Sequence, residues 1–131
     1  MMFNNECEIK KLIKRMGIPQ HLQGYEQLAY AISVVIDYPE ELQAVVKSLY
    51  PRVGQHFKTS ASRTERNIRH AIELSLDHAS HCIMSEVFGN TLTQRAGRII
   101  ERPTVSHYIA ACADYLKVER GCKSIMEALI V

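Results

Sequence analysis

The sequence predicts an all-α fold, a compact bundle of about six helices containing a helix-turn-helix, and three features support this prediction. Apolar residues recur at helical spacing in successive segments. Glycine or proline stands at the ends of these segments, where helices stop or start. No segment alternates cleanly between apolar and polar residues, and no Asn-Gly or Asp-Gly pair marks a hairpin. Strands are therefore not expected.

The composition is that of one globular domain. The chain has 131 residues, of which 47% are apolar and 23% are charged, enough to bury a core without a disulfide or a metal. We expect a single domain, 1–131, and a cytoplasmic location, because the sequence has neither a membrane-length apolar run nor a signal peptide. The four cysteines lack zinc-binding spacing, and we expect reduced packing residues rather than disulfides or ligands.

Two amphipathic helices are predicted first. Residues 6–16 form the first, which Gly17 and Pro19 end. Its expected buried residues are Ile9, Leu12, Ile13 and Met16. Residues 25–36 form the second helix, before Asp37-Tyr38-Pro39 breaks it. Its buried residues are expected to be Tyr25, Leu28, Ala29, Ile32, Val35 and Ile36.

A third helix is predicted over 39–49. Pro39 suits its first position, and two glutamates that follow lie near the positive end of the helix dipole. Its buried face is expected to consist of Leu42, Val45, Val46 and Leu49. Pro51 then ends or restarts the helix.

A helix-turn-helix is predicted over 50–79. It consists of a short helix with Val53 and Phe57 inside, a turn at 58–60, and a long recognition helix at about 61–79. Either Ser60 or Ser62 caps the long helix, and Ser62 with Glu65 fits a capping box. The long helix is expected to bury Ile68, Ala71, Ile72, Ser75 and Leu76.

The remainder is predicted to contain a short helix, a loop and a long helix. The short helix covers 81–88 and is closed by Gly89-Asn90, and residues 91–102 form a polar loop. Pro103-Thr104 starts the last long helix, and Gly121 separates it from a terminal docking helix at 122–131.

The distribution of charge is more informative than the formal net charge of +2. Between residues 52 and 70, Glu65 is the only acid among five basic residues, so the rest of the chain is net acidic. Those basic residues are Arg52, Lys58, Arg63, Arg66 and Arg69. Arg66 and Arg69 lie in the first turns of the long helix, and arginine binds guanine in a bidentate manner. Glu65 either accepts from a cytosine amino group or orients an arginine. The alternative is a solvated face with a weak Glu65–Arg69 pair.

Several motifs, in one order, resemble the C-terminal effector domain of the stage-zero sporulation response regulator, the master transcription factor of spore-forming bacteria. The main one is TSASRTERNIRHAIE at 59–73. The others are MGIPQHLQGY at 16–25, Leu49-Tyr50-Pro51, Val87-Phe88-Gly89, Arg102-Pro103-Thr104 and the helix at 108–116. The resemblance covers about 12–119.

The resemblance implies a six-helix domain that binds a short DNA box in the major groove, often as tandem copies on repeated boxes. Glu65, Arg66 and Arg69 fall at positions where the family reads bases, the same stripe that the helical wheel selects. Residues near the DNA backbone would be Lys58, Ser60, Ser62, Arg63, His70 and Arg102. The expected partners are double-stranded DNA, RNA polymerase and a second copy on tandem sites, with no membrane, metal or cofactor.

The chain departs from the family pattern in three places. It has no room for the phosphorylatable receiver domain, so it is either an excised domain or a naturally solitary homologue. The connector 91–102 is longer than the family pattern, and Arg95, Arg98 and Arg102 either contact phosphates or form a solvated loop. The extra tail, 120–131, either covers the core or pairs with another subunit.

Two other classes of function are considered beside DNA binding. An enzyme would use Asp77, His78 and His81, but two histidines three residues apart with no further ligand set are a weak signal. A protein-interaction module, or a titrating partner of another regulator, would keep the fold and act through the apolar tail. The arginine stripe favours a DNA-binding transcription regulator over both.

Overall fold

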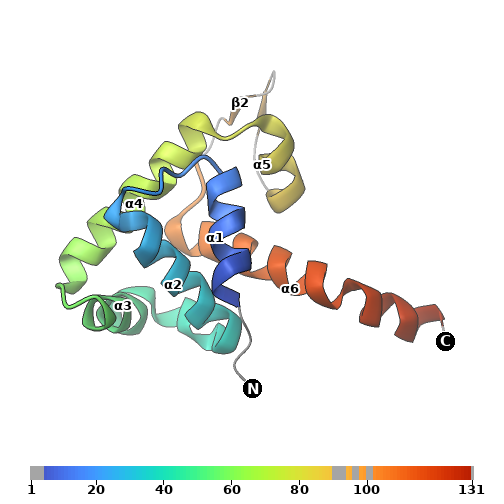
Figure 1. Ribbon diagram of the computed structural model, residues 1–131, viewed down its shortest axis with the longest axis horizontal. Helices are drawn as coiled ribbons and strands as arrows, with labels where there is room; N and C mark the ends of the chain where they lie inside the picture. Colours follow the sequence, from blue (N-terminus) through green and yellow to red (C-terminus); the bar gives the residue numbers. More distant parts are fainter. Residues whose placement is uncertain (1–4, 90–93, 96–97, 100–101, 131) are drawn as a thin grey trace.

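Helices make up nearly all of the part of the chain that the computed structural model describes, which is residues 5–89, 94–95, 98–99 and 102–130. The described residues form six α-helices, and Figure 1 shows how they pack into a bundle. They are α1 (Asn5–Arg15), α2 (Gln23–Asp37), α3 (Tyr50–His56), α4 (Ala61–His78), α5 (His81–Phe88) and α6 (Val105–Ile130). The predicted all-α bundle of about six helices is confirmed.

The predicted helix at 39–49 forms, but not as a regular α-helix. It winds as a 3₁₀-helix, η1 (Pro39–Ala44), and then as a π-helix, η2 (Val45–Leu49), which runs directly into α3. Leu49 is fully buried as expected, whereas Val46 is 68% exposed. The prediction for Val46 was wrong because it assumed 3.6 residues per turn, and a change from 3₁₀ to π winding rotates side chains away from those positions.

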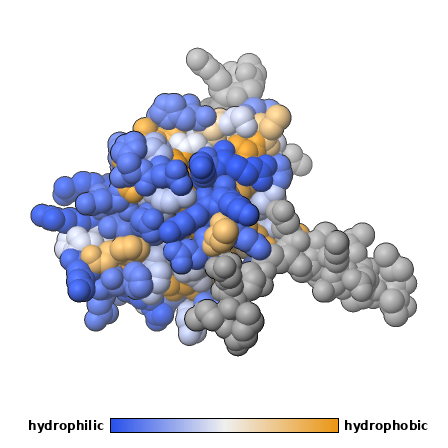
Figure 2. All heavy atoms as spheres, in the orientation of Figure 1, coloured by the Kyte–Doolittle hydropathy of each residue, from blue (hydrophilic) through white to orange (hydrophobic). Residues whose placement is uncertain are grey.

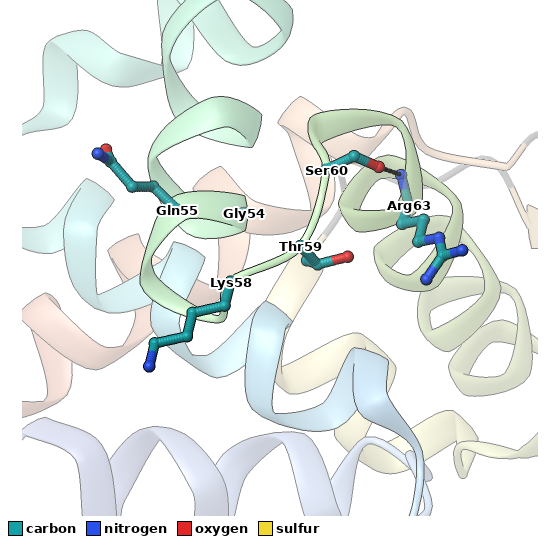
Figure 3. A pocket seen from close by; sticks show the side chains of 6 residues that line it. All are labelled: Gly54, Gln55, Lys58, Thr59, Ser60 and Arg63. Atoms are coloured by element: carbon teal, nitrogen blue, oxygen red, sulfur yellow. Dashed lines mark hydrogen bonds between the residues drawn. The ribbon is translucent and has the colours of Figure 1, made fainter.

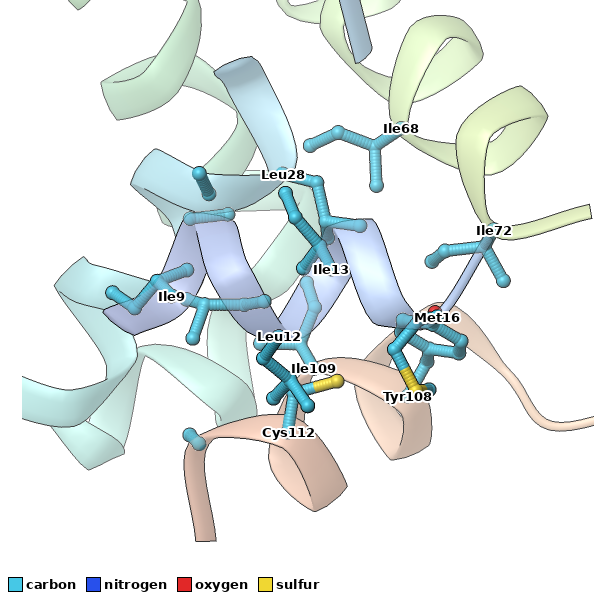
Figure 4. Packing of buried hydrophobic residues seen from close by; sticks show 14 of the residues in the cluster. Ile9, Leu12, Ile13, Met16, Leu28, Ile68, Ile72, Tyr108, Ile109 and Cys112 are labelled. Carbon is cyan, nitrogen blue, oxygen red and sulfur yellow. The ribbon is translucent and has the colours of Figure 1, made fainter. Parts of the chain in front are cut away.

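Residues from α1, α2, α4 and α6 form the centre of the core, as Figure 4 shows. The expected apolar residues of the first two helices are buried, except Ile36, which is half-buried. Residues of the core that Figure 4 labels are Ile9, Leu12, Ile13, Met16, Leu28, Ile68, Ile72, Tyr108, Ile109 and Cys112. The amphipathic patterns therefore identify which faces of these helices meet.

Helix α2 approaches α4 closely at Gly24. A Cβ atom at Gly24 would lie 2.3 Å from the Asn67 carbonyl oxygen and 3.0 Å from the Ala71 Cβ. On the same side, the Asn67 amide donates hydrogen bonds to Gln23 at 3.3 Å and to the buried Gln27 at 3.2 Å. Close packing and polar contacts together set how α4 lies on α2.

Helix α6 is joined to α4 by a buried pair of hydroxyl groups. The Ser75 Oγ and Tyr108 Oη atoms are 2.5 Å apart and both residues are fully buried. Burial raises the pKa of Tyr108 well above its ordinary value, so this phenol stays protonated. The pair ties the second half of α4 to the first turn of α6.

Helix α6 continues through Gly121 to Ile130, so the predicted break at Gly121 is wrong. Glycine costs only about 1 kcal/mol in a helix interior and does not by itself end a helix. The last part of α6 extends away from the bundle in Figure 1. Side chains beyond Val118 lie outside the described part of the chain, so the choice between covering the core and pairing with another subunit stays a prediction.

Part of the predicted loop at 91–102 is a short antiparallel ribbon. Strand β1 (Gln94–Arg95) pairs with β2 (Arg98–Ile99), with Gln94 opposite Ile99 and Arg95 opposite Arg98. The expectation that strands are absent was wrong here, because a strand of two residues is too short to show alternation. The other residues of the connector up to Glu101, together with Asn90, lie outside the described residues.

Of the three cysteines whose side chains the structure describes, Cys112 follows the prediction of a packing residue, and Cys122 lies beyond the described side chains. Cys112 is buried, and burial raises the pKa of its thiol to about 12. Cys7 and Cys82 are free thiols but are exposed, so the expectation that they pack in the core was wrong. Within the described ranges, none of the helices combines the length and the apolar character that a bilayer crossing requires.

We predict that Gly24→Ala destabilises the domain. The new methyl group would meet a backbone oxygen of α4 at 2.3 Å, and backbone cannot swing aside as a flexible side chain can. Overpacking of this kind costs about 1–3 kcal/mol, which outweighs the roughly 1 kcal/mol that alanine contributes over glycine in a helix. Thermal unfolding followed by circular dichroism measures the change. An unchanged or higher Tm would show that α2 and α4 are not in close contact here.

We also predict energetic coupling between Ser75 and Tyr108. Ser75→Ala leaves the buried Tyr108 hydroxyl without its partner, which costs about 1–3 kcal/mol. The Ser75→Ala, Tyr108→Phe double variant removes both hydroxyl groups and is expected to lose less stability than the sum of the single variants. Urea denaturation of the four proteins gives the coupling free energy. Additive losses would mean that the two hydroxyl groups do not interact.

Candidate nucleic-acid interface

Helices α3 and α4 form the predicted helix-turn-helix arrangement. Pro51 lies in the first turn of α3, where its missing N–H costs nothing. Tyr50, Val53 and Gly54 are buried, and Phe57, just after the helix, is half-buried and its ring lies perpendicular to that of Tyr30. The short helix is therefore held by its apolar face, as predicted.

The turn between the helices closes with Lys58 in a left-handed conformation, at φ 58°. The Lys58 N–H donates to the Gln55 carbonyl at 3.3 Å, and the Thr59 N–H donates to the Gly54 carbonyl at 2.8 Å. This pattern of two bonds is the Schellman motif that ends many helices, usually with glycine at the left-handed position. A Cβ atom at Gly54 would lie 2.8 Å from the Thr59 carbonyl oxygen, so glycine allows the turn to fold back tightly.

Ser60 caps α4. Its backbone is extended, and its side-chain oxygen accepts a hydrogen bond from the Arg63 N–H at 3.1 Å. The prediction that Ser60 caps the helix is confirmed. The predicted capping box of Ser62 with Glu65 is wrong, because Ser62 lies inside the first turn of α4. The long helix therefore begins at Ala61, as predicted, and ends at His78.

The three residues expected to read bases lie on the outer side of the N-terminal half of α4. The Glu65 carboxylate accepts from the Arg69 guanidinium at 2.6 Å, and the two side chains are 40% and 54% exposed. Arg66 is exposed, and among the described residues its side chain has no hydrogen-bonding or ion-pair partner. The same helix buries Thr64, Ile68, Ala71, Ile72 and Ser75 on its other side.

Three of the residues expected near the DNA backbone surround one open hollow beside the turn, shown in Figure 3. Lys58, Ser60 and Arg63 line it, together with Gly54, Gln55 and Thr59. In this view Lys58 and Arg63 extend on opposite sides of the turn, with Thr59 between them. Two cationic side chains thus flank the N-terminus of α4, where the helix dipole also attracts an anion.

Ser62 and His70 are exposed on the same helix, but Arg102 lies at its other end. The Arg102 guanidinium donates to the Asp77 carboxylate at 2.7 Å, in the last turn of α4. This bond to Arg102 is the main reason that the pKa of Asp77 is lowered. The structure therefore groups the expected site residues around the first half of α4 and separates Arg102 from them.

Two positioning residues were not found from the sequence. Tyr50 is buried close enough to the Glu65–Arg69 pair to feel both charges. Burial raises the pKa of Tyr50, and the negative charge of Glu65 raises it further. The positive charge of Arg69 lowers it. Asn67 holds α4 on α2 through the two glutamines described above. The sequence around Tyr50, at the start of a predicted helix, and around Asn67, between two arginines, does not indicate these contacts.

The surface over α3 and α4 is mainly hydrophilic in the orientation of Figure 2. Within the described ranges, no group of three or more His, Cys, Asp or Glu residues is arranged to hold a metal ion. The chemistry that this surface offers is therefore that of arginine, lysine, serine and one glutamate around the start of a helix. Such groups recognise phosphate and base edges.

The chain was compared with models of protein families. The model described as "Sporulation initiation factor Spo0A C terminal" matches residues 9–116, which includes the whole helix-turn-helix and the first half of α6. The chain therefore belongs to the family of C-terminal DNA-binding effector domains of the sporulation initiation factor Spo0A.

Proposed function

We propose that this domain is a sequence-specific regulator of transcription that binds double-stranded DNA with α4 in the major groove. Arg66 and Arg69 would contact guanine bases, and Glu65 would accept from cytosine or hold Arg69 in position. The domain would act without a cofactor or catalysis, and a cytoplasmic location is part of the proposal.

The observation that carries this proposal is the state of Arg66. It stands one turn into a capped helix, is exposed, and has no partner within the described part of the chain. An arginine whose role was to stabilise its own helix would be expected to pair with an acid three or four residues away. Arg66 instead presents its whole donor set outward, on the part of the helix that enters the groove when this motif docks.

The Glu65–Arg69 pair supports a role for Glu65 in orienting Arg69 for DNA. Exposed pairs at this spacing contribute only about 0.2–0.5 kcal/mol to stability, so the bond matters little for folding. It would nevertheless favour the orientation in which the Arg69 guanidinium lies against Glu65 before DNA arrives. Pre-organisation of this kind lowers the entropy cost of binding.

The backbone contacts would come from residues around the hollow and along α4. Lys58 and Arg63 supply charge, the Ser60 and Ser62 hydroxyl groups supply hydrogen bonds, and His70 lies about two turns further along the helix. These contacts would set the register of α4 on the duplex without reading sequence. Affinity would fall steeply with salt because each neutralised phosphate releases counterions.

A second candidate function is that of a protein-interaction module or a titrating partner of another regulator. The observation that favours it is an apolar groove of about 450 Å³ between α2, η1, α5 and α6. Its walls include Leu42, Val87, Phe88 and Ala111. RNA polymerase and a second copy on tandem sites remain proposed partners, implied by the family resemblance.

We predict that Arg66→Ala and Lys58→Ala weaken DNA binding in different ways. Arg66→Ala should lower the preference for a selected duplex over a random duplex by about 5- to 140-fold, equivalent to about 1–3 kcal/mol. Lys58→Ala should weaken binding to both duplexes equally and lower the slope of log affinity against log salt by about 0.9. Fluorescence anisotropy with duplexes selected by the protein measures both quantities.

The matched control is Arg15→Ala, which removes an exposed arginine of α1 that is paired with Glu86 rather than placed near α4. It should leave the preference unchanged. If the wild-type protein shows no preference for any selected duplex at low salt, the groove-reading proposal fails and the interaction module becomes the better account.

We further predict that Glu65→Gln broadens recognition. Loss of the carboxylate frees Arg69 and removes a negative charge beside the phosphates, so affinity for random duplex should rise. The ratio of the affinity for the selected duplex to that for random duplex should fall by about tenfold, equivalent to about 1.4 kcal/mol. Competition binding measures this ratio for Glu65→Gln and for the control variant Glu73→Gln, which removes another exposed acid of α4. Equal behaviour of the two variants would assign Glu65 to the solvated surface.

A further inference from the structure

Lys58 has an unfavourable backbone conformation. Among the described residues it is the only non-glycine residue with a positive φ, at 58°. In this left-handed region the Cβ atom of an L-residue crowds the following carbonyl oxygen. Glycine is the usual residue at this point of a Schellman motif because it has no Cβ atom. A strained residue of this kind persists where its surroundings hold it in place, and such residues gather at functional sites.

Three aromatic rings hold the chain just before Lys58. The His56 ring, at the end of α3, stacks on the Tyr30 ring of α2, with ring centres 3.9 Å apart and an angle of 12° between the ring planes. The Phe57 ring meets both at steep angles, 90° to Tyr30 and 78° to His56. Edge-to-face contacts of this kind are favourable. These three residues, the aromatic clamp, fix the end of α3 against α2.

The backbone after Lys58 is fixed by a different contact. The Thr59 N–H donates to the Gly54 carbonyl at 2.8 Å. The other bond of the Schellman motif, from the Lys58 N–H to the Gln55 carbonyl, is 3.3 Å long, beyond the usual range for such bonds. Lys58 itself is therefore held weakly by the backbone, and the aromatic clamp supplies the missing restraint from the preceding side.

We propose that the aromatic clamp keeps Lys58 in its left-handed conformation so that its ammonium group meets a DNA phosphate. Tyr30 and His56 are then positioning residues, which act on DNA through Lys58. A return of φ to negative values would change the direction of the lysine side chain relative to the hollow that it lines (Figure 3). The inference rests on the proposed function, from which it takes the backbone contact of Lys58.

The test compares Tyr30→Leu with the conservative variant Tyr30→Phe in the full chain, and uses Tyr38→Leu as the matched control. Tyr38 is 49% exposed, and its ring lies under the Arg52 guanidinium. Tyr30→Leu should lower the slope of log affinity against log salt, measured on random duplex, by at least half of the roughly 0.9 that one phosphate contact contributes. Tyr30→Phe keeps the ring and should keep the wild-type slope, as should the control.

A double-mutant cycle shows whether Tyr30 acts through Lys58. In the Lys58→Ala background, Tyr30→Leu should change neither the slope nor the affinity further, a coupling that a ring needed only for folding would not show. Circular dichroism identifies any variant that is unfolded at the temperature of the binding experiment. His56→Ala removes the other ring of the stack from an exposed position, and it should give the same result if Tyr30→Leu does not fold.

Lys58→Gly tests the strain directly. It should raise the Tm, because glycine tolerates the left-handed conformation, and lower the slope by about 0.9. A lower Tm, a wild-type slope in Tyr30→Leu, or independent effects of Tyr30 and Lys58 would each overturn the proposal. Sequence preference is read separately. Its absence in the wild-type protein would refute groove reading by α4, while the slopes on random duplex still decide the role of the aromatic clamp.

Discussion

The close approach of α2 to α4 at Gly24 is the constraint on which the rest of the structure depends. No side chain larger than hydrogen fits between the two backbones at this point, so the helices meet at one distance. Asn67 then anchors α4 through two glutamines of α2. Because Asn67 lies between Arg66 and Arg69 in sequence, the contact that holds the helix also determines how far these two arginines stand from the body.

The ends of α4 are held by different means. At its start, the Schellman turn and the Ser60 cap satisfy backbone groups that would otherwise lack partners. Near its end, the Ser75–Tyr108 pair connects α4 to α6, and the Asp77–Arg102 pair connects α4 to the residues just before α6. A helix held along its length and at both ends is suited to place several side chains at once, as recognition of a duplex requires.

Most of this architecture could be predicted because amphipathic helices have a strong periodic signal. The core positions of Ile9, Leu12, Ile13 and Met16, and Ser60 at the start of α4, follow from that signal and from helix capping. The pattern carries no information where local winding or tertiary contact decides. Val46 is exposed because the helix there is not α, and Gly121 continues a helix that glycine merely weakens.

Only part of the candidate site could be predicted from the sequence. The stripe of Glu65, Arg66 and Arg69 follows from helical geometry, and the structure brings these residues together on the outer face of α4. The separation of Arg102 from them depends on its contact with Asp77, near the other end of α4. A contact between residues 25 positions apart has no trace in the local sequence pattern.

The most direct test of DNA binding through α4 is an NMR titration of the isotope-labelled chain with its selected duplex, following every backbone amide. If α4 docks in the major groove, the largest shifts fall at residues 58–70, across the turn and the first half of α4, with little change along the apolar groove between α2, η1, α5 and α6. Shifts concentrated in that groove, with the amides of 58–70 unmoved, would contradict it.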